Sequence, residues 1–98
     1  MSRVAESIPL MSHIIRLSSA DNVAIAAEGL AVGEKVDVDG RLITIREPIS
    51  ACHKVAVAPI GRGEKVLKFG APIGSATGDI APGEHVHSHN LMSDYFPT

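Results

Sequence analysis

Three histidines recur at every second position in the run GEHVHSHNL, residues 83–91. On an extended strand, side chains alternate between two faces, and residues two apart lie about 6.6–6.8 Å from each other. His85, His87 and His89 would then share one face. Imidazoles on one face can bind a common metal ion, because each metal–nitrogen bond spans about 2 Å, and imidazole suits Zn, Fe, Ni and Cu. The same face could instead supply a general acid–base group near neutral pH.

Two plainer interpretations of this row stay open: an exposed polar strand face, and histidines that make structural hydrogen bonds. The CxxC and HExxH motifs, which specify a metal by themselves, are absent from the sequence. Glu84 would point to the opposite face, although Asp94 follows a few residues later. The row therefore provides part of a metal site, and other ligands must come from elsewhere in the chain.

The pair His53-Lys54 is a second candidate, because it begins an apolar run after a turn and one of the two side chains must face inward. A structural histidine and a solvated lysine are the alternatives. Cys52 precedes this pair, and only His53 and Lys54 lie near enough in sequence to lower the pKa of its thiol. The glycine-rich runs 61–63 and 70–78 match neither a P-loop nor a dinucleotide motif, so they predict turns.

Short strands dominate the elements that would position these residues. Strands are expected over 11–18, 53–60, 64–70 and 84–90, and the run EKVDVDGRLITIRE predicts a hairpin with its turn at Asp39-Gly40. Residues 19–30 predict a helix, since Ser19 or Asp21 can cap its start and Gly29 stands at its end. The segment 71–83 predicts a turn-rich connection.

A Gly-Glu-x-Val pattern appears three times, as GEKV from residue 33, GEKV from residue 63 and GEHV from residue 83. Each copy predicts a glycine turn followed by a strand whose valine points inward. The spacings of 30 and 20 residues are unequal, which excludes a solenoid. The pattern predicts a compact, mostly-β domain that is barrel-like or pseudo-symmetric.

The composition limits the function classes. The 98 residues suit one domain, and a net charge of −2 with scattered Lys and Arg argues against nucleic acid or an anionic membrane as a partner. One cysteine excludes an internal disulfide and is typical of a reducing, cytoplasmic location. No apolar run approaches the roughly 20 residues that span a bilayer, and the start MSRVAESIPLMSH lacks the pattern of an export signal.

The run CHKVAVAPIGRGEKVLKFGAPIGSATGDIAPGEHVHSHNL, residues 52–91, resembles the N-terminal domain of the altronate/galactarate dehydratase family, and IIRLSSADNVAIAAEGLAVGEKV resembles the start of that domain. The resemblance implies a SAF-type β-clip fold with short strands, tight turns and one short helix. It implies a flexible arm over 1–12, the SAF-like domain over 13–92 and a tail over 93–98. The family motifs fall on His53-Lys54, on Lys68-Phe69-Gly70 and on 83–91; Cys52 stands where the motif has Gly, and Phe69 where it has Tyr.

The resemblance also implies a function: a hydro-lyase acting on sugar acids with a divalent metal, Fe(II) first, with Mn or Zn as alternatives. The chain would be a small subunit or N-terminal domain that needs a large catalytic partner chain. The implied metal ligands are His85, His87 and His89; the implied catalytic groups are His85, His87 and Lys54; and the implied substrate-binding groups are His53, Lys68 and Asn90.

Two alternative functions stay open. The chain is also similar to the small subunit of sulfolactate sulfo-lyase, and SAF-type domains serve as non-catalytic binding or assembly modules elsewhere. A small domain with an unpartnered binding face can also self-associate into a homo-oligomer.

Overall fold

Short strands and tight turns make up the chain in the computed structural model, which describes residues 14–94. The expected arm over 1–12, most of the tail over 93–98, and His13 lie outside the described residues. The strands are β1 Ile14–Ile15, β2 Val23–Ala26, β3 Lys35–Val38, β4 Arg41–Thr44, β5 Lys54–Ala56, β6 Lys65–Lys68, β7 Ala71–Ala76, β8 His85–Val86 and β9 Leu91–Met92. This mostly-β architecture confirms the predicted fold class, except for the helix.

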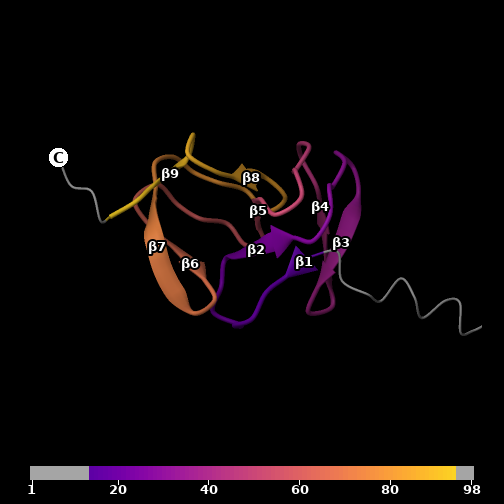
Figure 1. Cartoon of the computed structure of the whole chain (residues 1–98), viewed down its shortest axis with the longest axis horizontal. Helices are drawn as coiled ribbons and strands as arrows, with labels where there is room; N and C mark the ends of the chain where they lie inside the picture. The colour runs from indigo at the N-terminus through magenta and orange to yellow at the C-terminus, as the bar shows by residue number, and fades with distance from the viewer. Residues whose placement is uncertain (1–13, 95–98) are drawn as a thin grey trace, which may run out of the picture.

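A four-stranded antiparallel sheet of order β1-β2-β5-β8 lies in the middle of the molecule, as Figure 1 shows. The β3–β4 hairpin lies at one end, and the three-stranded sheet β6-β7-β9 lies at the other. Because side chains alternate along a strand, β5 sends Val55 into one hydrophobic core and Ala56 into a second. The middle sheet therefore contributes side chains to a core on each of its faces.

The helix predicted over residues 19–30 is wrong. Residues Val23–Ala26 form β2, which pairs with β1 on one side and with β5 on the other. Alanine favours a helix locally, but the small Ala24 and Ala26 side chains are fully buried in the core beside β-branched neighbours, so tertiary packing overrides the propensity. In the described part of the chain, no helix is long and apolar enough to cross a membrane.

Asp21 caps a distant turn instead of a helix. Its carboxylate oxygens accept hydrogen bonds of 2.7 Å each from the backbone N–H groups of Phe69 and Gly70. The turn has positive φ at both residues, 54° and 80°, like the predicted Asp39-Gly40 turn at 52° and 87°. The Asp39-Gly40 turn is confirmed, and the two hairpins share one turn geometry.

The connection predicted over 71–83 is partly wrong. Residues Ala71–Ala76 form β7, which pairs with β6 across a register shift between Val66 and Leu67. Small residues are required here by a close approach, because a Cβ at Gly74 would collide with the backbone carbonyl of Met92 in β9. Residues 77–83 form bends and a turn, as predicted, with one isolated bridge between Ile80 and Ile60.

Four copies of one loop, which we call the repeat loops, organise the domain: residues 30–34, 49–53, 60–64 and 80–84. In each, the fourth residue has a positive φ of 72–92° and donates its N–H to a carbonyl at 2.7–2.8 Å; these residues are Gly33, Cys52, Gly63 and Gly83. The valines that follow the three Gly-Glu copies are at most 4 % exposed, which confirms the predicted pattern. The copy at 49–53 was missed because Cys52 and His53 replace Gly and Glu.

Candidate metal centre

The histidine row is extended only at its start. β8 ends at Val86, and residues 87–90 form a turn, so the strand predicted over 84–90 is wrong beyond Val86. Asn90 explains the turn: its Oδ1 accepts the His87 backbone N–H at 2.9 Å, and its Nδ2 donates to the His85 carbonyl at 2.9 Å. These two bonds hold the backbone of residues 85–90 in a turn, so Asn90 positions the histidines by binding their backbone.

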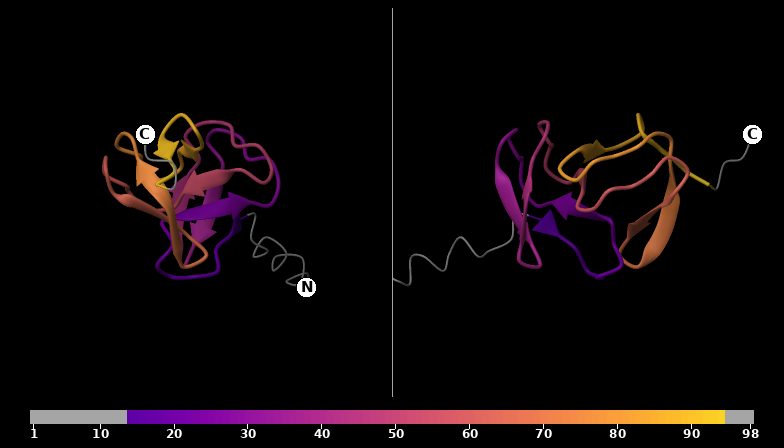
Figure 2. Two further views of the ribbon diagram at one scale, coloured as in Figure 1. Left: turned by 60° about the vertical axis from the view of Figure 1, so that its left-hand side comes forward. Right: turned by 180° about the vertical axis from the view of Figure 1, so that it is seen from behind.

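His53, His85 and His87 nevertheless come together. One ligand atom from each lies within 4.8 Å of those of the other two, and the His53 Nδ1 and His85 Nε2 atoms are 2.8 Å apart. The pairing of β5 with β8 brings them close, since Val55 is opposite His85 and His53 is two residues before Val55. Figure 2 shows from behind that the middle sheet lies between the β3–β4 hairpin and the orange strands β6 and β7. The three rings are nearly parallel, with centroids 4.7–5.3 Å apart.

This triad differs in one member from the set expected from spacing. His53, predicted to bind substrate, takes the place expected for His89. The His89 ring lies 5.4 Å from the His85 ring with a tilt of 36°, but it lies outside the converging group of described residues. Its role as a metal ligand stays a prediction.

The geometry suits a metal ion. Two metal–nitrogen bonds of about 2 Å join donors at most about 4 Å apart, so a triad spread over 4.8 Å needs only a small closure. His53 and His85 are half-buried and His87 is exposed, which leaves the outer side of the triad open to solvent. Burial lowers the pKa of His85, and the neighbouring histidines lower it further while Glu47 opposes them. A lowered pKa keeps the His85 imidazole neutral, which is the form that binds metal.

Lys54 and Lys68 lie apart from this triad. Alternation along β5 places Lys54 on the face of Ala56, whereas Val55 shares the face of His53 and His85. Burial and the nearby charge of Lys68 lower the pKa of Lys54, and the Lys68 ammonium lies 5.4 Å from the Phe69 ring centre. The structure thus separates the predicted lysines from the predicted imidazoles.

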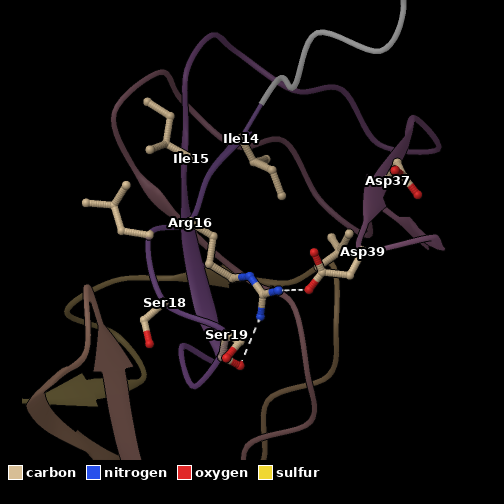
Figure 3. A pocket seen from close by; sticks show the side chains of 9 residues that line it. Ile14, Ile15, Arg16, Ser18, Ser19, Asp37 and Asp39 are labelled. Carbon is tan, nitrogen blue, oxygen red and sulfur yellow. Dashed lines mark hydrogen bonds and ion pairs between the residues drawn. The ribbon is translucent and has the colours of Figure 1, made fainter.

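Two grooves in the described part of the chain lie away from the histidines. The first, of about 440 Å³, is lined by residues 14–19 and 37–39. Figure 3 shows the Arg16 guanidinium there paired with the Asp39 carboxylate, so its charge is already neutralised. The second, of about 610 Å³, is lined along β4 and by Pro82. Neither of these two grooves is lined by a predicted site residue.

Glu47 is the site residue that sequence reasoning missed. Its Oε2 accepts the His85 backbone N–H at 3.0 Å. The repeat loops could have indicated that His53 is a site residue, because the other three copies have Glu at its position. In the other three copies, a Glu at this position turns back and accepts a backbone N–H within its own loop, as Glu84 does from Ala81 at 2.8 Å. His53 breaks that rule, and its ring lies against His85 instead.

Comparison with known sequences gives one family match. The family described as Altronate/galactarate dehydratase SAF domain matches residues 12–94. Altronate dehydratase from Escherichia coli (strain K12) is 46 % identical over 80 residues, which are 82 % of this chain and 16 % of that protein. Altronate dehydratase from Bacillus subtilis (strain 168) is 36 % identical over 84 residues, which are 86 % of this chain and 17 % of that protein.

A shorter relative matches over most of its own length. The (2R)-sulfolactate sulfo-lyase subunit alpha from Chromohalobacter salexigens is 32 % identical over 75 residues, which are 70 % of this chain and 80 % of that subunit. The chain thus spans only a small part of the two dehydratases but most of this subunit.

Proposed function

The chain belongs to the altronate/galactarate dehydratase SAF domain family, and on that premise we propose that it is the small component of a metal-dependent lyase acting on a hydroxy acid. The convergence of His53, His85 and His87 is the observation that supports this proposal most directly. An interaction surface for assembly alone has no need of three converging imidazoles.

The chemistry of the three donors fits a divalent ion. His53, His85 and His87 would hold it, with Fe(II) proposed first and Mn or Zn as alternatives. When bound, such an ion stabilises negative charge beside a carboxylate and assists the departure of a hydroxyl group. The chain itself contributes neutral imidazoles, a turn fixed by Asn90, and a solvent-open side on which substrate can approach.

We propose that a large catalytic chain completes this site. The relatives support the idea in two ways: two dehydratases of which this chain matches 16 and 17 %, and a subunit called alpha of which it matches 80 %. A partner over the triad would bury His87 and exclude water, as lyase chemistry on a charged intermediate requires. We propose that Lys54 and Lys68 bind an anionic group away from the triad. This group would be a carboxylate of the substrate or of the partner chain.

Metal binding by the isolated chain tests the first half of the proposal. The full chain is titrated with Co(II) by calorimetry, alongside His53→Ala, His89→Ala and a control, Lys35→Ala, on the exposed hairpin. We expect His53→Ala to weaken binding at least 100-fold, while Lys35→Ala and His89→Ala keep affinity within a few-fold. Loss in His89→Ala with retention in His53→Ala would instead support the set expected from spacing.

Activity of the reconstituted complex tests the second half. The chain is mixed with a candidate large catalytic chain of the same family and assayed on altronate, galactarate and sulfolactate with and without Fe(II). We expect turnover of one of the three that requires both chains and the metal, and that His53→Ala and His87→Ala abolish. Turnover of sulfolactate alone would favour the sulfo-lyase alternative. Failure of the chain to bind any divalent ion would favour the non-catalytic binding or assembly module.

A further inference from the structure

Glu47 reaches the histidine triad from a different part of the chain. The segment that follows β4 runs beside the repeat loop 80–84, where the Arg46 N–H donates to the Gly83 carbonyl at 2.9 Å. The next residue, Glu47, is half-buried, and its Oε2 accepts the His85 backbone N–H at 3.0 Å. Two consecutive residues thus tether the start of β8 by one backbone bond and one side-chain bond.

The charge of Glu47 is not used elsewhere in the described residues. The ion pairs there join Arg16 to Asp39 and Lys65 to Asp94, and neither involves Glu47. Among the described residues, burial lowers the pKa of His85 most, His53, His87 and His89 lower it further, and Glu47 is the carboxylate that raises it. Glu47 is therefore the acidic group that acts on this ring.

We propose that Glu47 is a positioning residue of the metal centre, which holds His85 in place and sets one negative charge beside three neutral imidazoles. The inference rests on the proposed metal binding by His53, His85 and His87. Three neutral donors leave the full charge of a dication uncompensated in a half-buried site. A carboxylate that orients a ligand and offsets this charge strengthens binding, as outer carboxylates of histidine metal sites commonly do.

The variants Glu47→Gln and Glu47→Ala separate the two contributions. Gln has the same shape and can still accept the His85 N–H, but it lacks the charge; Ala lacks both. In Co(II) titrations of the full chain, we expect about 10-fold weaker binding for Glu47→Gln and up to about 100-fold for Glu47→Ala. The control is Glu64→Gln, the same change at an exposed carboxylate in the repeat loop 60–64, and it should bind as wild type does.

A second measurement separates positioning from general damage to the fold. Thermal unfolding in the presence of a chelator should show the same midpoint for Glu47→Gln and wild type, since the hydrogen bond is kept. The visible Co(II) spectrum should keep its shape in Glu47→Gln and change in Glu47→Ala. Wild-type Co(II) affinity in Glu47→Gln overturns the proposal, because a neutral amide would then serve as well. Wild-type affinity in His53→Ala would overturn the metal centre itself, which is a distinct result.

Discussion

Cys52→Gly should stabilise the protein. Cys52 holds a φ of 72° at the position where the other repeat loops have glycines at 86–92°. The left-handed conformation destabilises an L-residue by roughly 1–2 kcal/mol, whereas glycine adopts it without strain. Glycine also makes the unfolded chain more flexible, which lowers the stability of the folded state by roughly 0.5–1 kcal/mol. Since the Cys52 side chain is exposed, little packing is lost, and the net gain should be about 0.5–1 kcal/mol.

Thermal unfolding of the metal-free chain measures this gain. A change of about 0.5–1 kcal/mol corresponds to a midpoint shift of roughly 2–6 °C for a domain of this size. Cys52→Ala serves as the matched control, because it removes the thiol but keeps the Cβ, and its midpoint should stay near that of wild type. Gly63→Ala reverses the experiment: its Cβ would meet nothing within 4 Å, so its expected loss of about 1 kcal/mol is purely conformational.

A Cys52→Gly protein no more stable than Cys52→Ala would refute the reasoning. The backbone at 52 would then be relaxed in the native state, and the loop 49–53 would not be a fourth copy of the other three. An equal gain in both variants would point to the thiol and not to the backbone.

Further predictions concern the turn, the pH dependence and one close approach. Asn90→Ala removes both bonds that close the turn after β8, so we expect a loss of about 1–2 kcal/mol in denaturant unfolding and weaker Co(II) binding. The pKa of His85 is lowered by burial and by its histidine neighbours; below pH 6.5 the unfolded chain takes up a proton that the folded chain does not, so metal-free stability should fall on acidification from pH 6.5, and His85→Asn should flatten that part of the profile. Burial of Asp21 would raise the pKa of its carboxyl, but bonds from two backbone N–H groups lower it below 3.8, so its stabilisation should be lost as the pH falls below about 4, and Asp21→Asn should weaken that loss. Gly74→Ala should unfold at a clearly lower temperature than wild type, because its Cβ would collide with the Met92 carbonyl.

Local rules were enough for the turns and for the inward valines. Asp39-Gly40 has the positive φ values that its residue types require, and the three Gly-Glu-x-Val copies each bury their valine. These features depend on neighbours within a few residues. The resemblance of residues 52–91 added the family, which the match over residues 12–94 confirms.

Long-range pairing decided what the sequence could not predict. The helix expected near residues 19–30 is β2, because it pairs with β1 along one edge and with β5, which is distant in sequence, along the other. His53 meets His85 across 32 residues, through the β5–β8 pairing. The two-residue spacing predicted His89 as a metal ligand, because it assumes an extended strand through residue 89. The Asn90 side chain instead holds residues 87–90 in a turn, which the alternation of side chains along a strand does not take into account.

The two hydrophobic cores share the strand β5, which has Val55 in one and Ala56 in the other. If either core unfolds, β5 loses the packing on one of its faces, and the same strand also forms part of the other core. The domain should therefore melt as one cooperative unit despite its small sheets, and the amide hydrogens of β5 should exchange with solvent at the rate of global opening. Because His53 directly precedes β5, the imidazole triad is tied to the most persistent segment of the protein, while the solvent side stays free to receive a partner.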